Sequence, residues 1–91
     1  MQWRIRIAAG VRRTMARLPT RIRDEVIDVL RDLRDEPRPA YSKPLGRELQ
    51  GLRTIRIEGW RLIYSVNDAD QVVLVVAIRQ RGPNTYLNLV L

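Results

Sequence analysis

Four side chains in the C-terminal half of the sequence are of types that can hold and orient a phosphate group. They are Arg56, Arg61, Arg81 and Tyr86. An arginine guanidinium makes paired, charge-assisted hydrogen bonds to phosphate oxygens, and a tyrosine ring can stack on a nucleobase. Arg61 interrupts the otherwise apolar and aromatic stretch EGWRLIYSV at residues 58–66. The chemistry that this set indicates is recognition of a polyanion.

The spacing of these residues predicts that they lie near one another. A tight turn at residues 58–59 would pair the segments on either side of it, and Arg56 and Arg61 would then be near cross-strand neighbours. Arg81 and Tyr86 follow the next apolar segment, which is expected to be the adjacent strand. Like charges opposed on a sheet cost stability, so a bound polyanion would account for the cluster.

A plainer explanation applies to each residue taken singly. An arginine can belong to a solvated sheet face, which is the explanation we favour for Arg53 and Arg79, and Tyr86 can cover a sheet edge. Sixteen of the 17 basic residues are arginine, with Lys43 the only lysine, and a GC-rich genome would give the same usage. The net charge of +7 nevertheless favours a nucleic acid or an acidic protein as partner, without choosing between them.

The sequence lacks the residues that other classes of catalytic site require. Histidine and cysteine are absent, which removes the commonest general base, disulfides and thiolate metal sites. Ser42 and Ser65 are the only serines, and neither has an activating base. The carboxylates of residues 24–36 are best explained as the wet face of a helix, and PLGREL at 44–49 has too few glycines for a phosphate loop. We therefore expect no metal and no cofactor.

The N-terminal half reads as one strand followed by two helices. Residues 2–7 alternate between apolar and polar side chains, as in a half-buried strand. Helical spacing begins at Ala8, and Pro19 is expected to separate two helices because proline suits a helix start better than an interior. The second helix should end by Glu36, since the residue before Pro37 is pushed out of helical geometry.

The C-terminal half reads as a long loop followed by three strands. Residues 37–51 hold three prolines and two glycines, and a loop of that length favours a function or a short helical turn. Three strands are predicted, at residues 52–58, 60–66 and 71–79. The last is an unbroken apolar run, as expected for a central strand that is covered on both faces. The expected fold is a single α+β domain over residues 1–91, ordered β-α-α-β-β-β, with two helices packed on a mainly antiparallel sheet.

Four short motifs follow one another along nearly the whole chain. They are a strand-then-helix opening that ends in RLP, the loop pattern KPLGREL.GLR, the strand GWRLIYSV, and the strand VVLVVAIRQR followed by Tyr86. In this order and within this length, the chain resembles the RelE/ParE superfamily of toxins from bacterial toxin–antitoxin pairs. The resemblance implies the α+β fold expected above, and it is closer to the RelE branch.

Function divides between the two branches of that superfamily. Toxins similar to RelE enter the ribosomal A site and cut mRNA, whereas ParE-like relatives lack the nuclease residues and poison DNA gyrase. The RelE pattern is matched at Arg56, Arg61, Arg81 and Tyr86. It is not matched at Thr54, where that pattern has a second basic residue on the strand, unless Arg53 or Arg47 substitutes.

The resemblance implies a reaction in which the RNA supplies its own nucleophile. The 2′-hydroxyl attacks the adjacent phosphate and leaves a cyclic phosphate and a 5′-hydroxyl. Arg61 and Arg56 would hold the negative charge of the phosphorane, Arg81 would act on the leaving-oxygen side, and Tyr86 would stack on a base or orient the 2′-hydroxyl. The further residues expected to contact RNA are Lys43, Arg47, Arg53 and Arg79.

The partners implied are the ribosome, its mRNA and a cognate acidic antitoxin that folds on the basic sheet. The apolar end YLNLVL at 86–91 would dock on the sheet or be completed by the antitoxin. With no signal peptide and no membrane span expected, a cytoplasmic location is the default. Two alternatives stay open: a gyrase inhibitor without nuclease activity, and an inert nucleic-acid binder.

Overall fold

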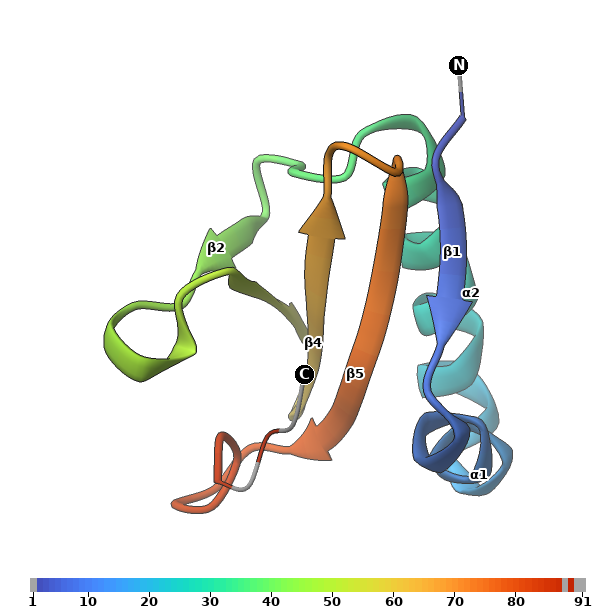
Figure 1. The fold of residues 1–91 in the computed structure, drawn as a ribbon. Helices are drawn as coiled ribbons and strands as arrows, with labels where there is room; N and C mark the ends of the chain where they lie inside the picture. Colours follow the sequence, from blue (N-terminus) through green and yellow to red (C-terminus); the bar gives the residue numbers. More distant parts are fainter. Residues whose placement is uncertain (1, 88, 90–91) are drawn as a thin grey trace.

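The computed structural model describes residues 2–87 and 89 and contains two helices packed against one mixed sheet (Figure 1). The elements in chain order are β1 (Arg4–Ile7), α1 (Ala9–Arg17), α2 (Thr20–Asp35), β2 (Ser42–Pro44), the 3₁₀ turn η1 (Arg47–Leu49), β3 (Leu52–Ile57), β4 (Trp60–Asn67) and β5 (Val72–Gln80). The strand order is β1-β5-β4-β3-β2, with β1 parallel to β5 and every other pair antiparallel. The predicted α+β class and the order of the predicted elements are confirmed.

The helix boundaries follow from their prolines and from one apolar stripe. Pro19 stands between α1 and α2 in extended geometry, and α2 ends at Asp35, directly before Glu36. Ile22, Val26 and Leu33 are buried along α2, at the spacing that puts side chains on one helix face. That face packs against the sheet, so the charged residues of α2 remain in water.

The strand β2 is absent from the sequence-based prediction, which treated residues 37–51 as a loop. It is a three-residue edge strand that pairs Lys43 with Thr54, and the chain returns to β3 with a hydrogen bond from the Leu45 N–H to the Leu52 carbonyl, 2.8 Å. A strand this short has no room for an alternating pattern, and Pro44 is a residue that sheets accept mainly at their edges. The short helical turn expected in this segment is confirmed as η1.

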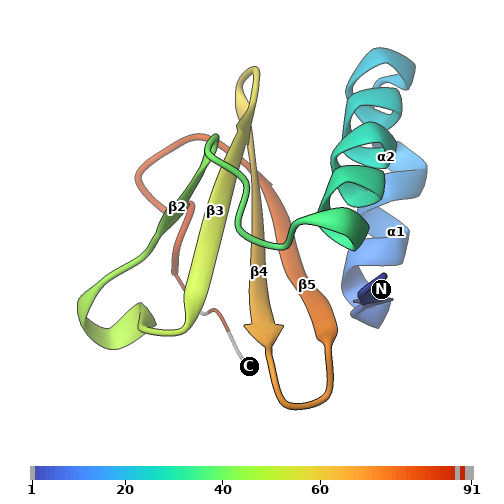
Figure 2. The same cartoon turned by 90° about the horizontal axis from the view of Figure 1, so that it is seen from above.

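The two faces of the sheet carry separate apolar clusters. The helix-side core joins α1 and α2 to side chains such as Ile55, Leu62 and Tyr64. The second core is small and is centred on Leu52, Ile63 and Ala77; the partly buried side chains packed against it are Leu45, Leu49, Val76, Tyr86 and Leu89. Figure 2 shows the helices together on one side of the sheet and the chain after β5 on the other. The prediction that the last strand, β5, is covered on both faces is therefore confirmed.

The second core also bears on the apolar C-terminal segment. Tyr86 and Leu89 pack against it, as docking on the sheet requires. Leu87 lies between them and remains exposed. Residues 88, 90 and 91 of that segment lie outside the described residues.

Two side-chain contacts fix the connection from α2 to β2. The buried Tyr64 hydroxyl donates to the Pro37 carbonyl at 2.8 Å. Arg38 donates two hydrogen bonds to the Asp68 carboxylate, at 3.0 and 2.8 Å, which joins this connection to the β4–β5 turn. The bond from Arg38 is the main cause that lowers the pKa of Asp68 below its ordinary value. The connection is thereby held at the start of β2, next to the candidate site.

Candidate nucleic-acid interface

Three arginines stand in one row across the sheet. Arg56 of β3 pairs directly with Arg61 of β4, and Arg61 pairs directly with Arg79 of β5. Side chains of directly paired residues lie on the same face of a sheet, a few ångströms apart. The predicted neighbourhood of Arg56 and Arg61 is confirmed, and the two-residue turn between their strands sets it. We call these three residues the arginine row.

A β-bulge brings Arg79 into the arginine row. Ile63 pairs with Ala77 while Tyr64 pairs with Val75, so Val76 is an extra residue in β5. Strict alternation from Val75, which faces the helix-side core, would have put Arg79 on that same face. The extra residue shifts the alternation by one position, so the Arg79 side chain lies on the same face of the sheet as Arg61.

A pocket of about 500 Å³ opens on this face of the sheet. Its lining residues are Tyr41, Lys43, Thr54, Arg56, Arg61 and Tyr86, which we call the basic pocket. Lys43 pairs directly with Thr54, so the Lys43 side chain projects from the strand position directly opposite that threonine. Four of the predicted site residues, Lys43, Arg56, Arg61 and Tyr86, are thus brought together.

The two pocket arginines differ in how their guanidinium groups are held. Nη1 of Arg61 donates to the Trp60 carbonyl at 3.0 Å and, more weakly, to the Glu58 carbonyl at 3.4 Å. Arg56 is exposed. Arg61 is therefore restrained by its own hairpin turn and keeps other N–H donors for a ligand, because a guanidinium has five.

The third member of the arginine row holds the segment that follows β5. Nη1 of Arg79 donates to the Thr85 carbonyl at 3.1 Å and to the Leu87 carbonyl. Thr85 is itself 5% exposed, and its hydroxyl bonds to the Gly82 N–H, the Gly82 carbonyl and the Gln80 carbonyl. These bonds fix the turn that carries Tyr86 to the rim of the basic pocket.

Sequence reasoning missed Thr85 and Tyr41. The signal for Thr85 is the turn composition RGPNT, in which a threonine hydroxyl commonly bonds nearby backbone groups. Tyr41 lines the basic pocket, and its hydroxyl donates to Oδ2 of Asp32 at 2.7 Å. Partial burial, followed by the bond to Asp32, raises the pKa of Tyr41, which therefore stays a protonated donor.

Two of the residues predicted to contact RNA, Arg53 and Arg47, lie away from the basic pocket. Arg53 pairs with Tyr64 and so faces the helix side, where its Nε and Nη2 donate to the Ser42 hydroxyl at 3.1 and 2.9 Å. Arg47 begins η1 with a left-handed φ of 57° and is exposed on a separate surface. Neither replaces a basic side chain at Thr54.

Arg81 lies just beyond the end of β5. Its backbone N–H donates to the Gly59 carbonyl at 2.7 Å, which keeps it beside the β3–β4 turn. The side chain is exposed and does not line the basic pocket. Its backbone therefore lies at the end of the sheet that carries the β3–β4 turn.

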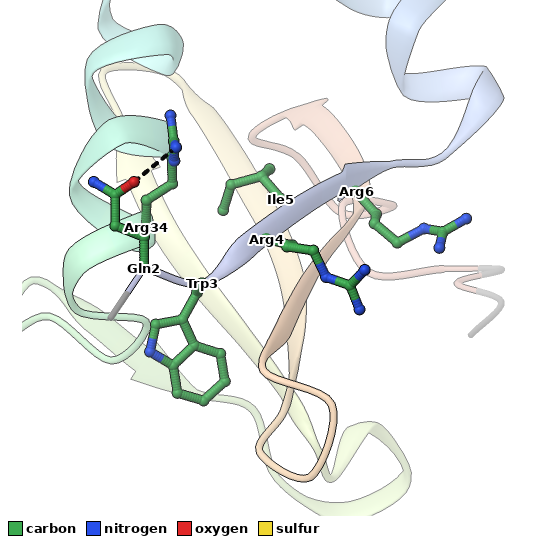
Figure 3. A pocket seen from close by; sticks show the side chains of 6 residues that line it. All are labelled: Gln2, Trp3, Arg4, Ile5, Arg6 and Arg34. Carbon is green, nitrogen blue, oxygen red and sulfur yellow. Dashed lines mark hydrogen bonds between the residues drawn. The ribbon is translucent and has the colours of Figure 1, made fainter.

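A larger hollow, of about 650 Å³, runs along the edge strand β1 (Figure 3). It is lined by Gln2, Trp3, Arg4, Ile5, Arg6 and Arg34. Figure 3 shows Arg4 and Arg6 projecting together from β1, while Arg34 donates to Oε1 of Gln2 at 2.8 Å. It contains none of the predicted site residues and no tyrosine, so the basic pocket is the better candidate despite being smaller.

Among residues 2–87 and 89, no three His, Cys, Asp or Glu side chains are grouped so as to hold a metal ion. No helix in the same residues is both long and apolar enough to cross a membrane. The basic pocket itself is lined by cationic side chains, two tyrosines and Thr54.

Comparison with known protein families gives a match over almost the whole fold. The family described as "ParE toxin of type II toxin-antitoxin system, parDE" matches residues 5–84, which run from β1 to the turn after β5. The chain belongs to this family of toxins. Every residue of the arginine row lies within the matched region.

Individual relatives of this toxin carry names from the RelE branch. It is 33% identical over 83 residues to toxin RelG of Mycobacterium tuberculosis, covering 90% of this chain and 94% of that protein. It is 28% identical to toxin RelE of the same organism, covering 94% of this chain and 89% of that protein. This likeness supports the placement near the RelE branch.

Solved structures share the fold of this toxin. The toxin–antitoxin complex RelBE2 of M. tuberculosis contains a chain with a TM-score of 0.77 and 32% identity, covering 89% of this chain and 100% of that one. The archaeal RelE–RelB complex of Pyrococcus horikoshii OT3 gives a TM-score of 0.79 and 27% identity, covering 91% and 99%. The first is a toxin–antitoxin complex, and the second is a complex of RelE with RelB.

Proposed function

We propose that this toxin cleaves mRNA on the ribosome and that the basic pocket is the cleavage site. The observation that carries the proposal is the meeting of Lys43, Arg56, Arg61 and Tyr86 around one pocket on the sheet. Several cations and an aromatic ring around one hollow fit a phosphate flanked by nucleobases. The likeness to toxins named RelG and RelE supports the same assignment.

In the proposed reaction the 2′-hydroxyl of the RNA attacks the adjacent phosphate. The P–O bond to the 5′-oxygen of the next nucleotide breaks, leaving a 2′,3′-cyclic phosphate and a 5′-hydroxyl; the proton lost by the 2′-hydroxyl is balanced by the one the 5′-oxygen gains. Arg61 and Arg56 stabilise the extra negative charge of the pentacoordinate phosphorane. Tyr86 stacks on a base or orients the attacking hydroxyl.

Arg81 acts on the leaving-oxygen side in this proposal. It is exposed beside the β3–β4 turn, two residues after Arg79 of the arginine row. An arginine stabilises negative charge far better than it releases a proton. The toxin thus contributes charge and positioning, and the ribosome must hold the RNA in a reactive geometry. We accordingly expect negligible cleavage of free RNA.

Lys43 compensates in part for the missing basic residue at Thr54. The two residues are directly paired, so the Lys43 ammonium can reach the phosphate region from the neighbouring strand. Thr54 lines the basic pocket, and its enclosed hydroxyl has no hydrogen-bond partner among the described residues. The hydroxyl adds no charge and so does not itself replace the missing basic residue.

Inhibition of DNA gyrase without RNA cleavage is the second candidate function. The observation that favours it is the match of residues 5–84 to the ParE toxin family, whose name is that of the gyrase-poisoning branch. In that case the arginine row would be a protein-docking surface. Changes at Arg81 or Tyr86 would then leave toxicity intact, whereas the nuclease proposal requires them to reduce it.

The test is primer extension on mRNA in a reconstituted translation reaction. Purified toxin is compared with its Arg61→Ala variant and with a reaction that lacks ribosomes. Cuts that depend on ribosomes and on Arg61 support the proposal. If message and translation both stay intact while purified gyrase accumulates DNA cleavage complexes, the second function replaces the first.

The partner in this proposal is an acidic antitoxin that covers the basic pocket. The net charge of +7 and the cations of the arginine row favour an acidic segment over a neutral one. The related toxins of M. tuberculosis and P. horikoshii were solved in complexes with antitoxins. A ribosomal target would place the protein in the cytoplasm.

A further inference from the structure

The basic pocket has a tyrosine on each side of its cations. Tyr86 packs against the second core and arrives from the turn after β5. Tyr41 comes from the opposite edge of the sheet, one residue before β2. Continuing the β2–β3 register by one position beyond Ser42 and Ile55 puts Tyr41 beside Arg56. The two aromatic side chains therefore reach the pocket from different segments of the chain.

Tyr41 is exposed but restrained. Tyr41 keeps 48% of its surface exposed, so its ring is open to a ligand. Its hydroxyl is fixed by the 2.7 Å bond to Asp32 of α2. A ring that is tethered at its hydroxyl end loses little conformational entropy when a planar ligand stacks on its face.

We propose that Tyr41 is a second base-stacking residue, so that the basic pocket holds one dinucleotide step. One base stacks on Tyr41 and the next on Tyr86, with the phosphate between them on Arg56 and Arg61. This inference rests on the proposed function, in that RNA is the ligand, and it extends it by giving the site two base positions. Tyr41 then influences which bases are accepted on its side of the phosphate.

A purely structural role for Tyr41 is the competing explanation. Its bond to Asp32 joins the edge strand β2 to α2, and this bond alone could explain the residue. Two substitutions separate the roles. Tyr41→Phe keeps the ring and loses the bond, whereas Tyr41→Leu loses both the ring face and the bond. A stacking role predicts that only the leucine variant weakens RNA binding.

The test uses short oligoribonucleotides that cannot be cleaved because every 2′-hydroxyl is methylated. Two oligonucleotides carry 2-aminopurine, a fluorescent base, on one side or the other of the central phosphate. Binding to the intact toxin is measured at low salt, where phosphate contacts are strongest. Thermal unfolding of each variant checks that the fold is kept. Tyr86→Leu is the matched variant for the other side.

The expected result is a pattern specific to position. Tyr41→Leu weakens binding about 10-fold and removes the fluorescence quench in one of the two oligonucleotides, while Tyr86→Leu does so in the other. Tyr41→Phe binds like the unmodified toxin. Equal affinity and equal quench in Tyr41→Leu would overturn the proposal, and so would an unmodified toxin that does not quench either oligonucleotide.

Failure of this inference is distinct from failure of the proposed function. Ribosome-dependent cuts that persist in Tyr41→Leu with unchanged sequence preference would leave the nuclease standing and remove only the second stacking residue. Position-specific quenching without any cut on the ribosome would have the opposite meaning. The dinucleotide site would then stand, and the reaction assigned to it would be wrong.

Discussion

Arg79 is paired directly with Arg61 on the sheet, although alternation along β5 would place the two side chains on opposite faces. The extra residue Val76 makes the difference, because it shifts every later side chain of β5 to the other face. The result is three adjacent like charges, in which Arg61 is flanked by Arg56 and Arg79. Such a row is unfavourable in the free protein and favourable once an anion binds.

Substitution of Arg61 should therefore separate activity from stability. Arg61→Ala is expected to lower ribosome-dependent cleavage about 10²- to 10³-fold, because one charge-stabilising donor is lost from the transition state. The same change relieves repulsion in the arginine row, so the urea midpoint should stay equal or rise. Single-turnover cleavage and urea unfolding measure the two quantities. A fall in both together would mean that Arg61 serves the fold.

A basic residue at position 54 should strengthen RNA binding. Thr54→Lys adds a cation within the basic pocket, next to Lys43, and we expect tighter binding of a short non-cleavable RNA. The slope of log affinity against log salt should steepen by about 0.7, the value for one more contact to a single-stranded phosphate. Thr54→Gln, which is long but neutral, is the control. An unchanged slope in the lysine variant would show that no phosphate lies near this position.

The strand and helix patterns in the sequence were sufficient to place Arg56 beside Arg61, because a two-residue turn leaves one register between the strands that it joins. They were insufficient for Arg79, since nothing in the apolar run 71–79 marks Val76 as the extra residue. They were also insufficient for Lys43. A three-residue edge strand has no periodicity, and its pairing with Thr54 depends on tertiary contacts such as the bond from Tyr64 to Pro37.

Arg53 and Arg47 were predicted as possible substitutes for the basic residue that is missing at Thr54. Both are close to Thr54 along the chain, yet Arg53 alternates to the other face and Arg47 belongs to a turn that leaves the sheet. Tyr41 was missed for the opposite reason. It lies in a loop by composition and reaches the basic pocket only because β2 folds back beside β3.

The hydroxyl of Thr85 should be needed to position Tyr86. Thr85→Val keeps the shape of the side chain but removes the hydroxyl bonds that this buried residue makes to Gly82 and Gln80, at a cost of about 1–2 kcal/mol in the free energy of unfolding. We expect cleavage to fall by more than this loss of stability explains at temperatures where the variant is folded. Thr85→Ser, which retains the hydroxyl, should recover both. Normal cleavage by a folded Thr85→Val would contradict the positioning role.

The Arg38–Asp68 ion pair should make the free energy of unfolding depend on pH in the acidic range. The pKa of Asp68 is lowered in the folded protein, so the pair stabilises the fold above the unfolded carboxyl pKa, about 3.9, and that contribution is lost as pH falls through the lower folded value. Asp68→Asn should therefore be less stable than the unmodified toxin at pH 7. The difference should shrink below about pH 4. Urea unfolding from pH 7 to pH 2.5 measures this difference in stability. A difference that does not change with pH would show that the substitution acts through the β4–β5 turn and not through the ion pair.

The most direct test of the central claim is one round of cleavage on ribosomes programmed with a defined mRNA. One message is all ribonucleotide, and the other has a single 2′-deoxynucleotide just before the scissile phosphate. We predict that the first is cut to a 2′,3′-cyclic phosphate end in an Arg61-dependent reaction, and that the second stays intact. Cleavage of both messages would contradict attack by the 2′-hydroxyl, and cleavage of neither would contradict the nuclease function itself.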